Sequence, residues 1–157
     1  MTKTNALRML ENAGIPFECT SYEVDEEDLS GVHAAGLLGI DPDTMFKTIV
    51  CRDDRGGHFV FCIPVAEELD LKKCAVAAGV KRVELLHVKE LLPLTGYIRG
   101  GCSPVGMKKK FPTFIHETAI VFDEIYVSAG QRGLQMKLSP ERLAEYLEAP
   151  FADLTKA

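Results

Sequence analysis

The sequence predicts an α+β fold, a single domain in which a mixed, curved β-sheet is flanked by helices. Its 157 residues match one ordinary domain, and no linker rich in Pro, Gly or Ser divides them, so we treat residues 1–157 as one domain. Helical and strand periodicities alternate along the chain. Strand segments that follow one another are joined by turns, which favours hairpins in a mixed sheet over a doubly wound parallel sheet.

The N-terminal segments alternate between helix and strand. Thr4 is a suitable N-cap for a helix that ends at Gly14 and carries its apolar residues on one side. Residues 17–22 alternate in polarity like a half-buried strand. Ser30 is placed to cap a second helix, which we expect to end at Gly39.

The middle of the chain contains a hairpin signal. Residues 46–51 and 58–63 are rich in β-branched and aromatic side chains, and the Asp- and Gly-rich residues 53–57 between them form a turn. These two strands are therefore predicted to pair antiparallel. Asp70 is placed to cap a helix that ends at Gly79.

The C-terminal part contains shorter segments. We predict a short helix over 88–92, β-rich runs over 119–122 and 125–128, a strand over 134–138, and a last helix that Ser139 caps and that runs to residue 147. The whole chain therefore contains about six strands and four or five helices by these patterns.

The composition is that of an ordinary soluble protein, with 46% hydrophobic and 26% charged residues. No run approaches the roughly 18 apolar residues of a membrane span, and the start has no secretory pattern, so we expect a cytoplasmic protein without a membrane partner. The five cysteines are scattered without a CxxC pair, which is typical of free buried thiols. The four histidines show no metal-ligand spacing, and no cofactor fingerprint is present, so we expect neither metal nor cofactor.

The net charge of −5 hides an uneven distribution. Residues 18–28 contain acidic residues and no basic one. In residues 72–110 the balance is reversed, because nine Lys and Arg face only two acidic residues, Glu84 and Glu90. The basic segment is compatible with a face that binds phosphates, and equally with a set of solvated lysines, because phosphate binding requires clustering in space. The candidates for such phosphate contacts are Lys72, Lys73, Lys108, Lys109 and Lys110.

Lys47 is the most informative single residue, because it interrupts an apolar, β-branched strand pattern. Either the strand directs its ammonium into a pocket, or the lysine lies at an edge and reaches water. The loop 100–106 is the second candidate, since its paired glycines allow a backbone to approach a ligand closely and to offer N–H groups to an oxyanion. Cys102 in this loop has no assigned base, which favours packing over catalysis.

The order of several short motifs resembles the YbaK/EbsC family, freestanding aminoacyl-tRNA deacylases related to the editing domain of bacterial prolyl-tRNA synthetase. The resemblance covers nearly the whole chain. Its motifs are Ser21-Tyr22-Glu23, Phe46-Lys47-Thr48, Leu69-Asp70-Leu71-Lys72-Lys73, Thr95-Gly96-Tyr97, Gly100-Gly101-Cys102-Ser103-Pro104-Val105-Gly106, Lys108-Lys109, Tyr126-Val127-Ser128 and Arg132-Gly133-Leu134.

The resemblance implies a compact fold with a barrel-like sheet and a metal-free pocket for the terminal adenosine and the aminoacyl group. It implies catalytic roles for Lys47, Gly100 and Gly101. The substrate-binding residues that we expect are Tyr22, Phe46, Thr48, Ser103, Pro104, Ser128 and Gln135. Family members commonly carry Asp at the position of Gln135, so this chain lacks a negative charge there.

Within the family the chain is most similar to the YbaK branch, which removes cysteine from mischarged tRNA(Pro). The resemblance implies trans-editing by substrate positioning, with the thiol of the cysteinyl ester attacking its own carbonyl, in a hydrolase or lyase reaction. It also implies prolyl-tRNA synthetase as a partner and no role for DNA. The alternatives are deacylation of another small aminoacyl-tRNA, such as Ala-tRNA(Pro), and a module that binds tRNA or the synthetase without catalysis.

Overall fold

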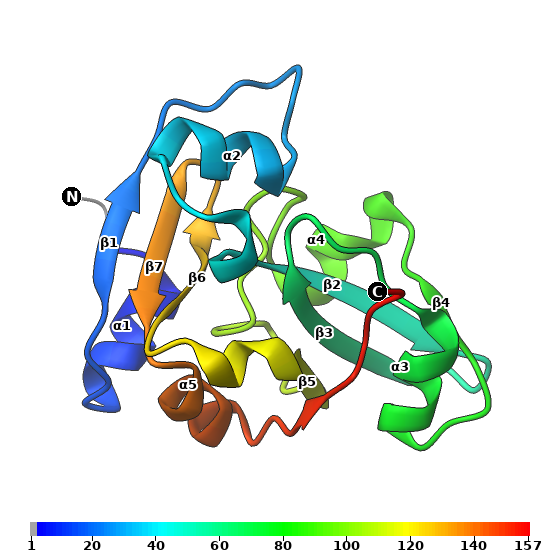
Figure 1. Ribbon diagram of the computed structural model, residues 1–157. Helices are drawn as coiled ribbons and strands as arrows, with labels where there is room; N and C mark the ends of the chain where they lie inside the picture. The colour runs from blue at the N-terminus through cyan, green and yellow to red at the C-terminus, as the bar shows by residue number, and fades with distance from the viewer. Residues whose placement is uncertain (1–2) are drawn as a thin grey trace.

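Two β-sheets with helices packed around them form the part of the chain that the computed structural model describes, residues 3–157 (Figure 1). The smaller sheet has three antiparallel strands in the order β1-β7-β6: β1 (Glu18–Ser21), β7 (Leu134–Leu138) and β6 (Ile125–Gln131). The predicted strands over 17–22, 125–128 and 134–138 are therefore confirmed and form one sheet.

The larger sheet has five strands in the order β4-β2-β3-β5-β8: β4 (Val83–Leu85), β2 (Phe46–Asp53), β3 (His58–Pro64), β5 (Thr113–His116) and β8 (Phe151–Ala152). The predicted hairpin is confirmed as the antiparallel pair β2 and β3. The pairs β3–β5 and β5–β8 are parallel, so this sheet is mixed. An isolated bridge between Met45 and Tyr126 links the sheets, which are not closed into a barrel. The α+β expectation is confirmed, and its barrel-like detail is not.

Among the α-helices of residues 3–157, all but α4 begin directly after a residue whose side chain caps them. The α-helices are α1 (Asn5–Asn12), α2 (Gly31–Leu38), α3 (Leu71–Ala78), α4 (Val88–Thr95) and α5 (Pro140–Leu147). The side chains of Thr4, Ser30, Asp70 and Ser139 accept hydrogen bonds from backbone N–H groups in the first turns of α1, α2, α3 and α5. Helices α2 and α3 end at Gly39 and Gly79, both in the left-handed region.

The apolar side chains form three clusters that hold the two sheets in place. The largest contains residues of both sheets together with α1 and α5, including Leu7, Val127 and Leu143. A second cluster lies between α3 and the larger sheet. A small third cluster lies beneath α2, where Ala34 and Met45 pack. No helix among residues 3–157 is both long enough and apolar enough to cross a membrane.

Several short segments differ from the sequence prediction. The run 119–122, predicted as β-rich, lies mostly in the 3₁₀-helix η2 (Glu117–Val121), and Ile120 and Val121 are 52% and 77% exposed. These β-branched side chains therefore do not pack on a sheet, and the prediction was wrong. Strands β4, β5 and β8 were missed, because they are short and pair with segments distant in sequence. A further 3₁₀-helix, η1 (Pro42–Thr44), connects α2 to β2.

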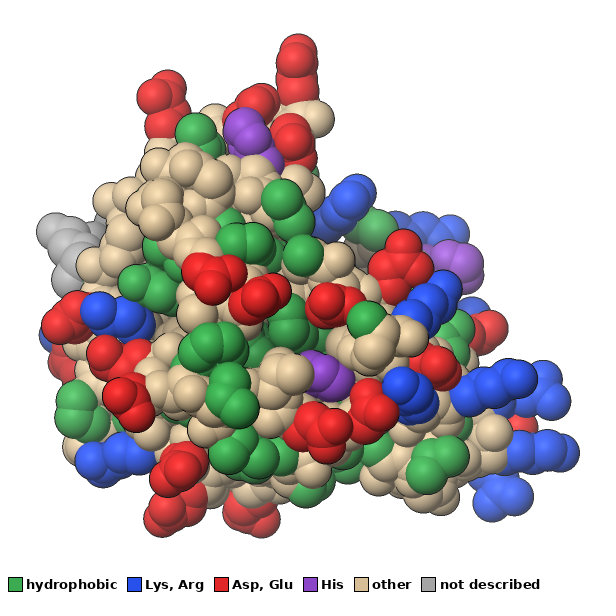
Figure 2. Space-filling model, viewed as in Figure 1, with side chains coloured by type: hydrophobic (Ala, Val, Ile, Leu, Met, Phe, Trp, Pro, Cys, Tyr) green, Lys and Arg blue, Asp and Glu red, His purple; other side chains and the backbone are tan. Residues whose placement is uncertain are grey.

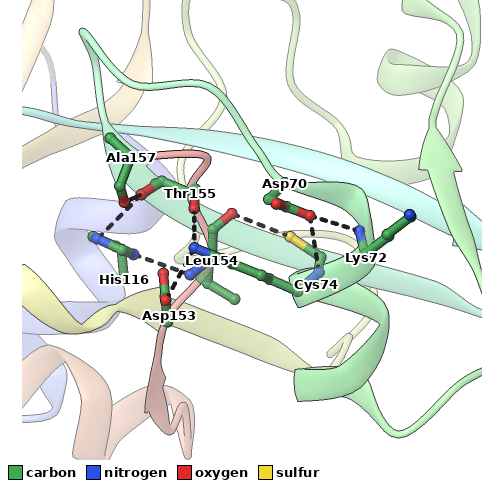
Figure 3. A network of polar contacts seen from close by, with 9 residues as sticks. Asp70, Lys72, Cys74, His116, Asp153, Leu154, Thr155 and Ala157 are labelled. Atoms are coloured by element: carbon green, nitrogen blue, oxygen red, sulfur yellow. Dashed lines mark hydrogen bonds and ion pairs between the residues drawn. The ribbon is translucent and has the colours of Figure 1, made fainter.

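His116 fixes the C-terminal tail against strand β5 (Figure 3). Its Nδ1 accepts a hydrogen bond from the Leu154 N–H at 3.1 Å, and its Nε2 lies 3.4 Å from Thr155 Oγ1. Burial lowers the pKa of His116 from its ordinary value of 6.5, although Asp153 and Glu117 oppose the shift. The tail contact therefore requires a neutral imidazole with Nδ1 unprotonated.

We expect the free energy of unfolding to fall as the pH drops below about 6.5, since the unfolded chain then binds a proton that the folded chain resists. The loss should level off below the folded pKa of His116. Urea unfolding between pH 5 and 8 measures it. The variant His116→Gln should flatten this dependence, and His87→Gln at an exposed position should leave it unchanged. An equally steep dependence in His116→Gln would show that other groups cause it.

Candidate active site

A cleft of about 320 Å³ lies where the two sheets meet beneath α2. It brings together seven residues predicted from the sequence, which come from β2, β6, β7, the glycine loop and the position directly after β1. These residues are Tyr22, Phe46, Lys47, Thr48, Gly100, Ser128 and Gln135. Segments that are distant in the sequence therefore meet at a single cavity, as an active site requires.

Lys47 enters the cleft from β2, where it lies opposite Ile63 of β3. Its ammonium makes no hydrogen bond and no ion pair with any residue in the range 3–157. Burial lowers the pKa of Lys47, and the more distant carboxylates Glu68 and Glu67 oppose this shift. A partly desolvated ammonium without a partner is well suited to hold an oxygen of a ligand. Of the two interpretations of Lys47, the structure supports the pocket.

The wall opposite Lys47 belongs to the three-stranded sheet. Leu134 and Met136 are buried in the main core, so the alternation along β7 turns Gln135 to the other face, toward the cleft. Ser128 of β6 lies directly across from Gln135. Its Oγ accepts a hydrogen bond from the Gly130 N–H at 3.2 Å, which leaves the hydroxyl proton available. Gln135 is 7% exposed, and its Oε1 has no hydrogen-bond partner among residues 3–157.

The glycine loop packs against the turn between β6 and β7. Gly100 has a φ of +85°, a conformation that favours glycine. A Cβ on Gly101 would lie 2.8 Å from the backbone nitrogen of Arg132. The Arg132 Nε donates a hydrogen bond to the carbonyl of Arg99 at 2.8 Å, which holds the loop in place.

One expectation about this loop is wrong. The Gly101 N–H donates to the Ile98 carbonyl at 2.9 Å, and Gly101 does not line the cleft. It therefore cannot offer that N–H to an oxyanion without breaking the turn. In contrast, the N–H groups of Gly100 and Cys102 carry no hydrogen bond within the part of the chain described, and both residues line the cleft.

Two other predicted substrate contacts lie outside the cleft. Ser103 is fully buried, and its Oγ accepts a hydrogen bond from the Val105 N–H at 3.2 Å, which shapes the loop. Pro104 lines a second cavity of about 270 Å³, together with Tyr146 of α5 and Lys109. Both residues belong to the glycine-loop motif of the resemblance, but the loop turns away from the cleft after Cys102.

The five lysines predicted to contact phosphates lie on two separate segments, helix α3 and the loop at 108–110. Lys72 and Lys73 lie on α3, where Lys73 contacts Asp153 at 3.1 Å and the Thr155 carbonyl at 2.7 Å. In the loop at 108–110, Lys108 donates to the Pro93 carbonyl at 3.3 Å and Lys110 pairs with Glu148 at 2.6 Å. The five side chains therefore do not form one basic patch.

Charged side chains are unevenly distributed over the surface. Figure 2 shows acidic side chains at the end that holds α2 and basic side chains on the side of α3 and β4, where Lys72, Lys81 and Arg82 are exposed. Within residues 3–157, no Asp or Glu lines the cleft, and no group of three or more His, Cys, Asp or Glu could hold a metal ion. The cleft itself therefore carries positive charge, from Lys47 and Arg99.

Part of the rim of the cleft was not predicted from the sequence. Arg99, Leu29, Ser30 and Gly31 line the cleft, but they belong to loop ends or to a helix cap, and their pattern carries no signal of function. Gly31 could have been found through its packing alone, because a Cβ there would lie 2.3 Å from Val65 Cγ1. Arg99 appeared in the sequence only as one of many basic residues.

Cys102 lines the cleft, yet its thiol is not a nucleophile. Burial raises the pKa of Cys102 to about 12, and the neighbouring Cys62 acts in the same direction. The side chain is therefore a neutral thiol at physiological pH. We expect Cys102→Ala to keep the deacylation that the family resemblance implies within about threefold of the wild type, since a neutral thiol is not an activated nucleophile. A loss of more than about a hundredfold in a folded Cys102→Ala protein would contradict this.

Comparison with known proteins identifies the family of the chain. The family model described as "Aminoacyl-tRNA editing domain" matches residues 28–146. The chain therefore belongs to the aminoacyl-tRNA editing family.

A known relative specifies the activity of this family member more closely. The chain is 47% identical over 153 residues to the "Putative Cys-tRNA(Pro)/Cys-tRNA(Cys) deacylase EbsC" of Enterococcus faecalis (strain ATCC 700802 / V583), covering 98% of this chain and 93% of that protein. This protein is thus an aminoacyl-tRNA deacylase of the YbaK/EbsC type.

Solved structures agree on the fold. A crystal structure of a hypothetical protein matches with a TM-score of 0.85 and 25% identity, covering 95% of this chain and 97% of the other. The crystal structure titled "a putative trans-editing enzyme for prolyl tRNA synthetase" matches with a TM-score of 0.80 and 22% identity over 97% and 93% of the two chains. At that identity the second likeness concerns the fold alone.

Proposed function

We propose that this deacylase removes cysteine from mischarged Cys-tRNA(Pro), and that the cleft between the sheets is where the ester breaks. The observation that carries the proposal is the unpartnered ammonium of Lys47 in a cleft without a carboxylate or a reactive thiol. Such a cleft can position an activated ester but cannot attack it. The name of the 47% identical relative supports cysteine as the amino acid.

The reaction follows from the groups present. Lys47 holds an oxygen of the terminal nucleotide, and the N–H groups of Gly100 and Cys102 bind the ester carbonyl oxygen as negative charge develops on it. The substrate's own thiol, with a pKa near 8.5 in solution, loses its proton and attacks the carbonyl carbon. The C–O ester bond breaks, the ribose oxygen leaves as a hydroxyl with the proton, and a cyclic thioester of cysteine is released for hydrolysis.

An editing step of this kind is useful because synthetase pockets discriminate poorly among small side chains. One methylene contributes only about 1–3 kcal/mol to discrimination, so a pocket for proline admits smaller amino acids. A second site that cleaves the wrong product corrects this error.

The test is release of labelled amino acid from Cys-tRNA(Pro), Cys-tRNA(Cys), Ala-tRNA(Pro) and Pro-tRNA(Pro). We expect cysteine to be released at least about tenfold faster than alanine, which has no thiol, and proline to be retained. Preferred release of alanine would contradict thiol assistance and indicate a deacylase for Ala-tRNA(Pro). Tight binding of tRNA without release from any substrate would contradict catalysis.

The lysines of the loop at 108–110 are proposed to contact acceptor-stem phosphates, with Lys72 and Lys73 of α3 as a separate second group. The net charge of −5 disfavours tight binding of tRNA by the chain alone, which supports action beside prolyl-tRNA synthetase. Changing Lys108, Lys109 and Lys110 to Ala should therefore reduce the slope of log KM against log salt by about one to two.

The matched control is Lys3→Ala. Lys3 is an exposed lysine that pairs with Glu11 at 2.8 Å on α1. Its removal should leave the slope unchanged. If the triple variant keeps the wild-type slope as well, the lysines of this loop are solvated surface residues.

A further inference from the structure

The Oε1 atom of Gln135 is a buried acceptor without a partner at the wall of the cleft. Gln135 is only 7% exposed, and no group within residues 3–157 donates a hydrogen bond to its Oε1. Buried amide oxygens are nearly always hydrogen-bonded, and one that is not calls for an explanation. The cleft that Gln135 lines offers an explanation, because a ligand bound there can donate the missing hydrogen bond.

The sheet holds this amide in a fixed place. Gln135 lies on β7, the middle strand of the three-stranded sheet, directly opposite Thr20 of β1 and Ser128 of β6. Its neighbours Leu134 and Met136 are anchored in the main core. The backbone at this position therefore cannot turn to satisfy the amide elsewhere, and the acceptor is prepared before a ligand arrives.

Among the side chains that line the cleft within residues 3–157, Gln135 Oε1 is the one buried polar atom without a hydrogen-bond partner. Ser128 Oγ accepts from the Gly130 N–H, and Thr48 Oγ1 lies 3.8 Å from Cys62 Sγ. Lys47 can only donate. Among the residues that line the cleft there is no Asp or Glu. Gln135 Oε1 is thus the buried acceptor that remains for a donor on the ligand.

An aminoacyl ester carries one strong donor close to its carbonyl, the α-ammonium with its three N–H bonds. A thiol is a weak donor by comparison, and hydrogen bonds to charged groups are the stronger ones. We propose that Gln135 binds the α-ammonium of the aminoacyl group through Oε1, so that the cleft recognises a free α-amine by a hydrogen bond to a neutral amide rather than by an ion pair.

The inference rests on the proposed function, and binding tests it without relying on cleavage. The probes are non-hydrolysable 3′-cysteinylamido-adenosine and its desamino counterpart, 3′-(3-sulfanylpropanoyl)amido-adenosine, which differ only in the amine. Their Kd values are measured by titration for the wild type, Gln135→Met and Gln135→Glu.

We expect the wild type to bind the amine-bearing probe about ten- to a hundredfold more tightly than the desamino probe, the range for one hydrogen bond to a charged group. Gln135→Met has a similar length and no acceptor, so the preference should disappear. Gln135→Glu keeps an acceptor, so the preference should persist or grow. A preference that is the same in Gln135→Met and the wild type would overturn the proposal.

Two further outcomes separate the possible failures. A third probe, 3′-alanylamido-adenosine, lacks the thiol. If Gln135→Met binds it as tightly as the cysteinyl probe but still binds the cysteinyl probe more tightly than the desamino probe, Gln135 binds the thiol and the proposal is wrong. If neither probe binds the wild type, both the proposal and the function fail. Thermal unfolding serves as the control for folding, since removal of an unsatisfied buried acceptor should leave the Tm of Gln135→Met unchanged or higher.

Discussion

Replacing Lys47 by Ala should lower kcat/KM for deacylation by at least about a hundredfold to a thousandfold while the protein stays folded. Arg99, the other cation that lines the cleft, is exposed, and the Lys47 ammonium makes no hydrogen bond or ion pair within residues 3–157 that its loss would break. Its removal therefore takes away substrate positioning without damaging the fold. Release of labelled cysteine under single-turnover conditions measures the effect, with Lys3→Ala as the control for a lysine remote from the cleft.

A second test of Lys47 compares the effect of its replacement on stability with the effect on activity. Burial lowers the pKa of Lys47 below its ordinary 10.5, so the folded protein pays for keeping it charged. That penalty is complete below the folded pKa and disappears as the pH rises toward 10.5. Lys47→Met should thus raise or preserve the free energy of unfolding at pH 7 although it abolishes activity. A marked loss of stability together with near-normal activity would contradict the assignment of Lys47.

Replacing Gly101 by Ala should be nearly as damaging, for a different reason. The added Cβ would meet the Arg132 nitrogen at 2.8 Å and the carbonyl carbon of Gln131 at 3.0 Å, and both are backbone atoms that cannot rotate away. The loop must then shift, and it carries the N–H groups of Gly100 and Cys102 with it. We expect a loss of about 1–3 kcal/mol in stability and about a hundredfold in kcat/KM, since misplacement by about 1 Å is enough for that.

The control for this substitution is Gly36→Ala in helix α2. A Cβ on Gly36 meets nothing within 4 Å, and the residue is exposed. Alanine there should stabilise the protein by about 0.5–1 kcal/mol through helix propensity and leave activity unchanged. Urea unfolding and the deacylation assay on both variants separate the effect of the tight contact from that of any Gly-to-Ala change. Normal activity in Gly101→Ala would contradict the role of the loop.

Local signals made much of the fold predictable. A cap residue such as Ser30 and a turn such as that at residues 53–57 act through contacts within a few positions, so the sequence alone reveals them. Strand β5 depends instead on parallel pairing with β3 and β8, whose paired residues lie 53 and 36 positions away, and its four buried residues show no alternation. The exposed run in η2 shows the reverse error, because β-branched residues there do not pack on a sheet.

The site was predictable to a similar degree. Lys47 was conspicuous as a charge within an apolar strand, and Gln135 as a departure from the family pattern. The use of the Gly101 N–H within a turn, the position of Ser103 behind the loop and the arrival of Arg99 at the rim depend on how the loop folds back on β6. Such details depend on the path of the loop backbone, which spacing along the chain does not encode.

The most direct test of the central claim, that the aminoacyl end of the tRNA binds in the cleft between the sheets, is a crystal structure with 3′-cysteinylamido-adenosine bound. We predict that the ligand occupies this cleft, with an oxygen of the nucleoside at Lys47, the amide carbonyl near Gly100 and the α-ammonium at Gln135. A ligand bound instead in the second cavity, beside Tyr146 and Lys109, would contradict the account.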